Sequence, residues 1–211
     1  MSDKANREVT PFYRTMRTVI GALMHVLFPV KYHNRENIDA LNAPYIILGN
    51  HQSFVDPVAI AVGTRYDEIH FVGKKELGKY KLAAWFFNKL HGIMIGRGDT
   101  DMAAMRKCMQ VLKENHVLGI FPEGTRHQKA MMDHVETGAA LIALRSKATV
   151  IPVYIHKKPR LLRRTHVYFG RVMELEDLYQ QGLSTESVNA LCSRIRDTFY
   201  AMRAAAEQKN G

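Results

Sequence analysis

Apolar residues recur at helical spacing near the start of the chain, from Phe12 to Leu27. Pro11 stands where the first turn of a helix tolerates proline, and Arg14 and Arg17 follow it. The pattern predicts an amphipathic helix, and two interpretations stay open: a helix that packs on its own domain, or one that lies in a membrane surface. Because the stretch without ionised side chains, Thr18 to Val30, is shorter than the roughly 20 apolar residues of a spanning helix, we expect no transmembrane segment.

Further along the chain, short apolar runs typical of buried strands alternate with longer stretches of helical spacing. Strands are predicted at residues 44–48, 69–72, 93–95, 117–121, 150–155 and 165–169. Helices are predicted at 57–62, 80–90, 100–115, 135–146 and from about 184, with a frayed tail after 204. The alternation predicts an α/β fold with a mostly parallel central sheet flanked by helices. Since no linker divides the pattern, we expect an N-terminal amphipathic helical element at 1–35 and one α/β domain at 36–211.

The composition is that of a globular protein, with 46% apolar and 24% charged residues in 211. It excludes disorder, collagen and coiled coil for the whole chain. The only two cysteines, Cys108 and Cys192, lie far apart on helical stripes, which favours core packing in a reducing compartment over a disulfide framework or a nucleophile. The first residues lack the layout of a secretory signal, so export is not indicated.

The chain carries a net charge of +10 and has a pI near 9.7, which indicates an anionic partner: nucleic acid, anionic lipid or a phosphorylated substrate. Between Glu136 and Glu174 there are eight Lys and Arg residues and no acidic residue. This stretch is suited to anionic headgroups, a nucleotide or an acidic carrier protein, or it is simply a solvated basic face. Neither clustered RNA-binding aromatics nor a zinc-finger pattern is present, which disfavours nucleic acid.

A candidate acid–base pair follows the first buried strand, in the segment NHQSFVD. His51 and Asp56 stand five residues apart in the turn that leads to the next helix. A histidine whose tautomer is held by a carboxylate is a general base able to take a proton from an alcohol. The spacing alone is weak, and a histidine that only bonds locally is the plain alternative. No GxSxG motif accompanies the pair, so direct transfer is favoured over a serine intermediate.

Two further segments end strands at the same predicted edge of the sheet. In FPEGTR, residues 121–126, proline and glycine predict a sharp loop that displays Glu123 for substrate hydroxyls and Arg126 for a phosphate; an ordinary solvated turn is the alternative. Lys75 and Arg97 follow the strands at 69–72 and 93–95, where converging cations suit a phosphate dianion. The histidines form no HxH or HExxH set, so no metal site is expected.

Taken in order, NHQSFVD, the segment from GKKEL to IGR, FPEGTR and VIPV resemble the four motifs of the glycerolipid acyltransferases, specifically the lysophosphatidic acid acyltransferases. The resemblance spans about residues 45–155. It implies transfer of a fatty acyl group from acyl-CoA or an acyl carrier protein to the sn-2 hydroxyl of 1-acyl-sn-glycerol 3-phosphate, giving phosphatidic acid. No cofactor is implied, because the thioester co-substrate is already activated.

The resemblance also implies roles for single residues. His51 is the implied general base and Asp56 its orienting partner. The acceptor and its phosphate are assigned to Lys75, Arg97, Glu123, Gly124, Thr125 and Arg126, and the acyl-donor region to Pro152. Backbone N–H groups around Gly124 are candidates for stabilising the oxyanion. Gly96 departs from the acidic residue that many relatives carry before the second-motif arginine.

Because the implied acceptor and product live in a bilayer, the N-terminal element is expected to contact an anionic membrane surface. The expected location is the cytoplasmic face, with peripheral or monotopic attachment. Another acceptor, such as glycerol 3-phosphate or another lysolipid, is the nearest alternative. A non-catalytic basic membrane-binding module is the alternative from another class, and it leaves the ordered motifs unexplained.

Overall fold

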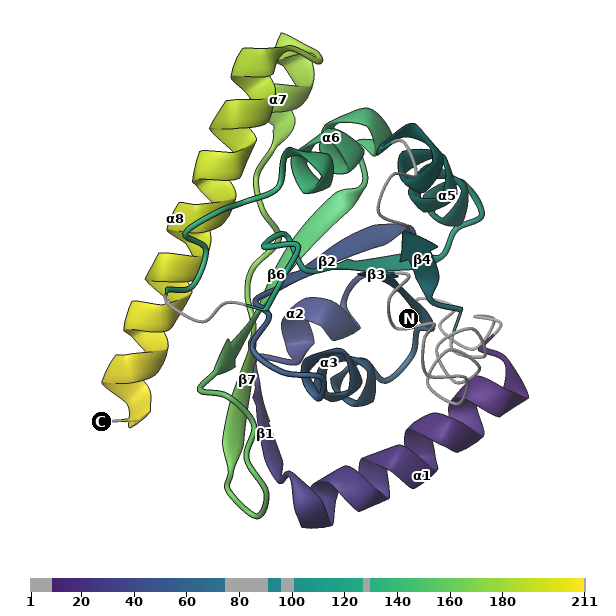
Figure 1. Ribbon diagram of the computed structural model, residues 1–211, viewed down its shortest axis with the longest axis vertical. Coiled ribbons are helices and arrows are strands. Elements are labelled where there is room, and N and C mark those ends of the chain that lie inside the picture. Colours follow the sequence, from purple (N-terminus) through teal and green to yellow (C-terminus); the bar gives the residue numbers. More distant parts are fainter. Residues whose placement is uncertain (1–8, 75–90, 96–100, 127–129, 211) are drawn as a thin grey trace.

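A seven-stranded sheet forms the centre of the protein in the computed structural model, which describes residues 9–74, 91–95, 101–126 and 130–210 (Figure 1). The strands are β1 (Val30–His33), β2 (Tyr45–Gly49), β3 (Ile69–Lys74), β4 (Ile93–Ile95), β5 (Val117–Ile120), β6 (Thr149–His156) and β7 (Thr165–Phe169). Their order across the sheet is β1-β7-β6-β2-β5-β3-β4. The fully buried strand β2 therefore lies in the middle, between β6 and β5.

The sheet is mixed, which corrects the expectation of a mostly parallel one. Five neighbouring strands run parallel to one another: β6, β2, β5, β3 and β4. Strand β7 pairs antiparallel with β6, and β1 pairs parallel with β7, so these two strands run in the opposite direction. The reason is the connection between β6 and β7, residues 157–164, since a parallel crossover needs about a dozen residues or more. The coarser prediction of an α/β fold with a central sheet flanked by helices is confirmed.

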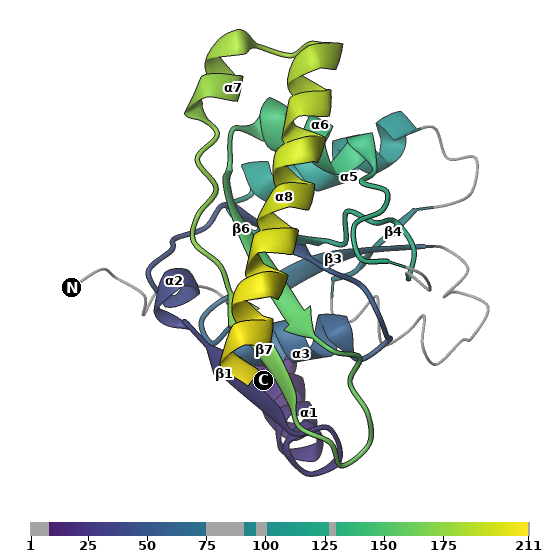
Figure 2. The same cartoon turned by 90° about the vertical axis from the view of Figure 1, so that its left-hand side faces the viewer.

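Helices cover both faces of the sheet (Figures 1 and 2). One face packs against α1 (Pro11–Leu27), α2 (Glu36–Asp39) and α3 (Asp56–Gly63). The other face packs against α5 (Asp101–Lys113), α6 (Thr137–Ser146), α7 (Glu176–Gln181) and the long α8 (Thr185–Asn210). Cys108 is buried in this second core, as its apolar stripe predicts, and burial raises the pKa of its thiol to about 11.

Helix α1 begins where the sequence predicts, and it packs on α3. Thr10 caps it by accepting a hydrogen bond from the Tyr13 N–H at 3.3 Å, with Pro11 in the first turn. The buried Tyr13 hydroxyl accepts from the Ile69 N–H, and Arg17 donates to the Thr64 carbonyl at 3.0 Å. No helix within the described ranges is both long and apolar enough to cross a bilayer.

Most predicted elements are confirmed within a few residues. The helix at 80–90 lies outside the described residues, and β1, α2 and α7 were not predicted. The prediction that the helix frays after residue 204 is wrong. Helix α8 continues to Asn210, and Ala206 is buried in the core. The boundary at residue 35 stays a prediction, although β1 of the first segment pairs with β7 of the second.

Candidate active site

The turn after β2 carries the predicted acid–base pair. Because this turn follows the carboxyl end of β2, it lies at the edge of the parallel strands where α/β sheets place ligands. Strand β2 is central, so the turn has a neighbouring strand on each side. The Nδ1 atom of His51 lies 3.0 Å from the Oδ2 atom of Asp56, the first residue of α3. The Asp56 side chain is fully buried and that of His51 is 19% exposed. The pair therefore joins a buried carboxylate to a partly exposed imidazole, which meets Asp56 through Nδ1 and not through Nε2.

The Asp56 carboxylate is held in one orientation by the turn itself. Its Oδ2 atom accepts hydrogen bonds from the backbone N–H groups of Gln52 and Ser53, at 2.5 and 2.6 Å. Its Oδ1 atom accepts from the Ser53 hydroxyl at 2.7 Å. Since the Ser53 proton is committed to Asp56, the geometry gives no support for Ser53 as a nucleophile.

The FPEGTR turn, which follows the neighbouring strand β5, supports His51 from two sides. The ring of Phe121 stacks on the imidazole with centroids 4.3 Å apart. Glu123, which is 2% exposed, accepts from the His51 backbone N–H at 2.9 Å with one oxygen and from the Met132 N–H at 3.2 Å with the other. This gives Glu123 a positioning role that the sequence did not reveal; its direct contact with an acceptor stays a prediction.

Strand β6 holds the same turn from its other neighbour. The buried Asn50 side chain donates to the Ile155 carbonyl at 3.1 Å and accepts from the Ile155 N–H at 2.7 Å. Gln52 donates to the same carbonyl at 2.8 Å. The three strands in the middle of the sheet thus fix the position of His51 together.

The remaining residues of FPEGTR form a tight turn at the surface. Gly124 has a φ of +64°, and a Cβ atom there would lie 2.9 Å from the Glu136 side chain, so the position favours glycine. The N–H of Gly124 donates to the Phe121 carbonyl, and that of Thr125 to the Glu123 carbonyl. Because these N–H groups are already bonded within the turn, the structure does not support them as oxyanion donors.

The exposed Arg126 lies against the His51 turn. Its guanidinium carbon is 3.8 Å from the centroid of the Phe54 ring, and Phe54 itself is 64% exposed. A cation is therefore held at the surface beside the acid–base pair, where it can meet an anionic group. The other two predicted phosphate ligands, Lys75 and Arg97, lie outside the described residues.

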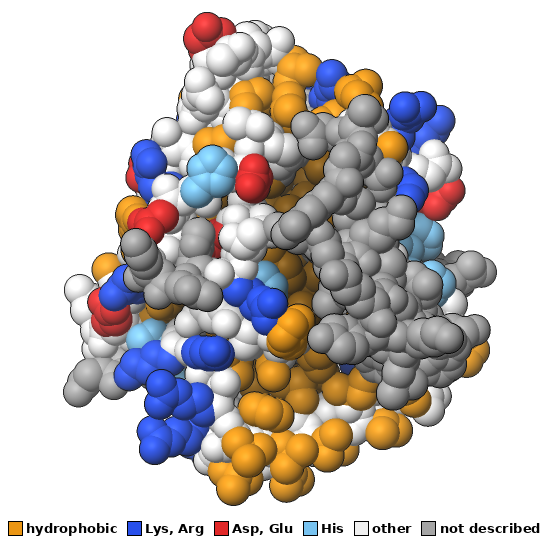
Figure 3. Space-filling model, viewed as in Figure 1, with side chains coloured by type: hydrophobic (Ala, Val, Ile, Leu, Met, Phe, Trp, Pro, Cys, Tyr) orange, Lys and Arg blue, Asp and Glu red, His pale blue; other side chains and the backbone are white. Residues whose placement is uncertain are grey.

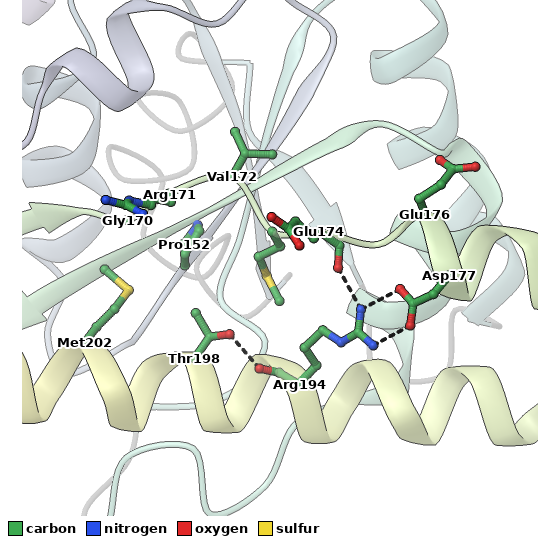
Figure 4. Close-up of a pocket in the computed structure, with 11 residues that line it drawn as sticks. Pro152, Gly170, Arg171, Val172, Glu174, Glu176, Asp177, Arg194, Thr198 and Met202 are labelled. Carbon is green, nitrogen blue, oxygen red and sulfur yellow. Dashed lines mark hydrogen bonds and ion pairs between the residues drawn. The ribbon is translucent and has the colours of Figure 1, made fainter.

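Pro152 is not brought together with His51. It faces α8, while its neighbours Ile151 and Val153 belong to the core beneath α3. Pro152 lines a groove of about 710 Å³ between α8 and the chain after β7, and neither His51 nor Asp56 lines it (Figure 4). There Arg194 is paired with Asp177 at 2.6 Å, which lowers the pKa of that carboxyl to about 2. The assignment of Pro152 to the acyl donor stays a prediction.

Several residues that build the site were missed from the sequence, namely Asn50, Ser53, Phe54 and Phe121. All four lie within the segments NHQSFVD and FPEGTR, and this position is the signal in the sequence that could have identified them. Among the residues that the structure describes, no three His, Cys, Asp or Glu side chains gather as a metal site requires.

Comparisons with known proteins agree with this geometry. The acyltransferase family matches residues 29–156, a segment that runs from the start of β1 to the end of β6 and includes both turns. A 1-acyl-sn-glycerol-3-phosphate acyltransferase of Streptococcus pneumoniae is 27% identical over 205 residues, covering 93% of this chain and 75% of that protein. Another protein of that name, from Bacillus subtilis, is 29% identical over 140 residues, which cover 66% of this chain and 69% of the Bacillus protein.

A solved structure shares the fold. The crystal structure of PlsC, the 1-acyl-sn-glycerophosphate acyltransferase of Thermotoga maritima, matches with a TM-score of 0.67 at 21% identity. The match covers 94% of this chain and 79% of that one. The resemblance to acyltransferases inferred from the four motifs is confirmed, and the chain belongs to the acyltransferase family.

Proposed function

We propose that this protein transfers a fatty acyl group from a thioester, acyl-CoA or an acyl carrier protein, to the sn-2 hydroxyl of 1-acyl-sn-glycerol 3-phosphate. The product is phosphatidic acid, the precursor of phospholipids. The names of the relatives from Streptococcus pneumoniae and Bacillus subtilis support this choice of acceptor.

The observation that carries the proposal is the pair of His51 and Asp56 at the carboxyl edge of the sheet. With Nδ1 bonded to the buried carboxylate, the ring has Nε2 left to accept a proton from an alcohol. The carboxylate then stabilises the imidazolium that forms. General base catalysis of this kind contributes about 10²–10⁴ in rate.

In the proposed reaction, Nε2 of His51 removes the proton of the acceptor hydroxyl while the hydroxyl oxygen attacks the thioester carbonyl carbon. A C–O bond forms, and the carbonyl electrons move to the oxygen. When the tetrahedral intermediate collapses, the C–S bond breaks, and the imidazolium returns the proton to the departing thiolate. The step needs no metal or cofactor, because a thioester is already an activated acyl donor.

The acceptor phosphate is proposed to lie at Arg126. Its guanidinium stands on the Phe54 ring beside the His51 turn, where a phosphate accepts two N–H bonds from one arginine. Lys75 and Arg97 are proposed as further cations for the same phosphate, following the motif resemblance.

The acceptor lies in a bilayer, so we also propose that the protein works attached to the cytoplasmic face of a membrane. Helix α1 supports this, since Val19, Leu23 and Val26 form an apolar stripe that is more than half exposed. Anionic lipid is the proposed partner surface, given the net charge of +10.

The test is mass spectrometry of lipid products after incubation of the purified protein with lysophosphatidic acid and either oleoyl-CoA or an acyl carrier protein thioester. Wild type is expected to form phosphatidic acid with at least one donor, His51→Ala to form essentially none, and the control His33→Ala to match wild type. Activity retained by His51→Ala would overturn the base assignment. Acylation of glycerol 3-phosphate or another lysolipid alone would overturn the acceptor.

A further inference from the structure

The loop between β6 and β7, residues 157–164, combines two features that rarely occur together on a water-exposed surface. Its sequence is KKPRLLRR, in which Pro159 alone is buried. Leu161 and Leu162 are 59% and 69% exposed and stand between cations on both sides. The loop thus presents two exposed leucines with Lys and Arg residues before and after them in the sequence.

The conformation of the chain holds this tip outward. Arg163 donates its backbone N–H to the Arg160 carbonyl at 3.1 Å, which closes a tight turn with the two leucines at its apex. Leu162 has a φ of +57°, in the left-handed region that a branched side chain seldom adopts. A folding chain accepts such a conformation only where surrounding contacts enforce it, so the outward position of the leucines is built into the loop.

The loop is bonded to the end of α1. The Leu162 N–H donates to the Leu27 carbonyl at 2.7 Å, and the Thr165 N–H to the Pro29 carbonyl at 2.9 Å. The leucine tip therefore lies beside the end of α1, next to the last residue of its exposed apolar stripe, Val19, Leu23 and Val26. Figure 3 shows hydrophobic side chains along this lower edge of the molecule, with Lys and Arg side chains gathered beside them at the lower left.

Two exposed threonines of α1 are compatible with a nearby lipid surface. The hydroxyls of Thr15 and Thr18 donate back to the carbonyls of Pro11 and Arg14, at 2.9 and 3.0 Å. Their donors are therefore satisfied within the helix. What this edge presents is apolar surface next to a cluster of Lys and Arg side chains, of which Lys157 lies close to Glu207 of α8.

We propose that the loop at residues 157–164 is a second membrane anchor, which inserts Leu161 and Leu162 into an anionic bilayer while its five cations bind lipid headgroups. The cations are Lys157, Lys158, Arg160, Arg163 and Arg164. The sequence has no acidic residue from 137 to 173, and Glu207 of α8 lies near Lys157, so the loop keeps a net positive charge. An amphipathic surface with this charge matches anionic lipid in both its apolar and its electrostatic parts.

The anchor also has a consequence for the site. The loop begins two residues after Ile155, whose backbone is bonded by Asn50 and Gln52 of the His51 turn. Docking the loop therefore brings the carboxyl edge of the sheet to the lipid surface. This consequence rests on the proposed function, whereas membrane binding by the loop does not.

The test is co-sedimentation with vesicles of phosphatidylcholine alone or mixed with phosphatidylglycerol, at low and high salt. Wild type is expected to prefer the anionic vesicles. L161S/L162S is expected to bind them tenfold more weakly or worse, and R163Q/R164Q to lose about tenfold at low salt. The matched controls are L183S, at a leucine before α8 that is 49% exposed, and R196Q on α8. Far-UV circular dichroism verifies that each variant is folded.

Insertion is measured separately with Leu161→Trp, whose fluorescence is expected to shift to the blue and to be quenched by brominated lipid, unlike that of Leu183→Trp. Wild-type vesicle binding by L161S/L162S, or no quenching of Leu161→Trp, would overturn the proposal. Acylation of a detergent-dispersed acceptor is expected to be unchanged in L161S/L162S. Failure of the anchor and failure of the proposed reaction are therefore distinguishable, because loss of acylation in wild type leaves vesicle binding intact.

Discussion

Two histidine sites at the edges of the sheet differ in their partners. His51 is bonded through Nδ1 to the buried carboxylate of Asp56. On strands β1 and β7, the Nε2 of His33 lies 3.0 Å from the Nδ1 of His166, and His33 also stacks on the Tyr168 ring at 4.3 Å. The first site couples an imidazole to an acid, and the second couples an imidazole to another imidazole.

The partner decides what each ring can do. Burial lowers the pKa of His33, and the nearby His166, Lys31 and Lys209 lower it further; burial, Lys31, Arg164 and Lys157 do the same for His166. A second proton on this pair is therefore unfavourable, whereas a carboxylate stabilises an imidazolium. A histidine is therefore a better candidate for a general base when its partner can stabilise the protonated ring, as a carboxylate does.

Neutralising the Asp56 carboxylate should remove the difference between the two histidine sites and have the largest effect. Asp56→Asn is expected to lower the rate of acyl transfer by about 10²–10⁴, because the imidazolium loses its partner and the amide disturbs the ring tautomer. Initial rates of phosphatidic acid formation measure the loss. The control Asp197→Asn removes an exposed carboxylate from α8 and is expected to leave the rate unchanged. Equal rates for the two variants would remove Asp56 from the proposed mechanism.

Glu123→Gln tests whether Glu123 positions the backbone of His51. An amide can accept only one of the hydrogen bonds that the carboxylate accepts from the His51 and Met132 N–H groups, so we expect the free energy of unfolding to fall by about 1–3 kcal/mol. The expected kinetic effect is a kcat about tenfold lower with an acceptor KM within about twofold of wild type. Denaturant titration and steady-state kinetics measure both. A raised KM at constant kcat would instead indicate direct binding of the acceptor.

Arg126→Ala tests the cation beside the proposed base. We expect the acceptor KM to rise about fivefold with little change in kcat, because a surface-exposed contact to phosphate is lost. Arg126→Lys should recover part of the affinity, since it keeps the charge without the bidentate geometry. Arg196→Ala serves as a control on the exposed face of α8. An unchanged KM in Arg126→Ala would place the phosphate elsewhere.

The smallest effect is expected at the His33–His166 pair. Since the folded-state pKa of each ring lies below the unfolded value of about 6.5, the unfolded chain binds more protons and stability is lost as the pH falls below that value. His166→Gln is expected to reduce this loss, with a Tm at pH 5.5 closer to its value at pH 7.5 by about 2 °C. Thermal unfolding at the two pH values is the measurement. A Tm that rises on acidification in wild type would contradict the pKa direction.

Sequence patterns predicted the elements that bury a continuous apolar face and missed those that do not. Strands β2 and β5 are fully buried runs with a clear signal. The edge strand β1, VKYH, has an exposed lysine and no fully buried residue, and α2 is a single turn, so neither has a recognisable period. The direction of β7 depends on the length of the loop at residues 157–164, which is too short for a parallel crossover.

The candidate site was predictable where side chains meet side chains. His51 and Asp56 are close in sequence, so their contact follows from the turn. The positioning role of Glu123 was not predictable, because it depends on hydrogen bonds from the backbone N–H groups of His51 and Met132, and every residue type except proline supplies such a group. The same holds for Asn50, whose partner Ile155 offers only its backbone.

The contact between Asn50 and Ile155 has a consequence for the order of events during synthesis. The two residues are far apart in the chain, and β6 is made long after the His51 turn has left the ribosome. Until residue 155 emerges, the turn lacks one of the strands that hold it, and the pairing of β2 with β6 has not formed. We therefore expect a nascent chain that carries both His51 and Asp56 to lack a fixed site until β6 has been translated.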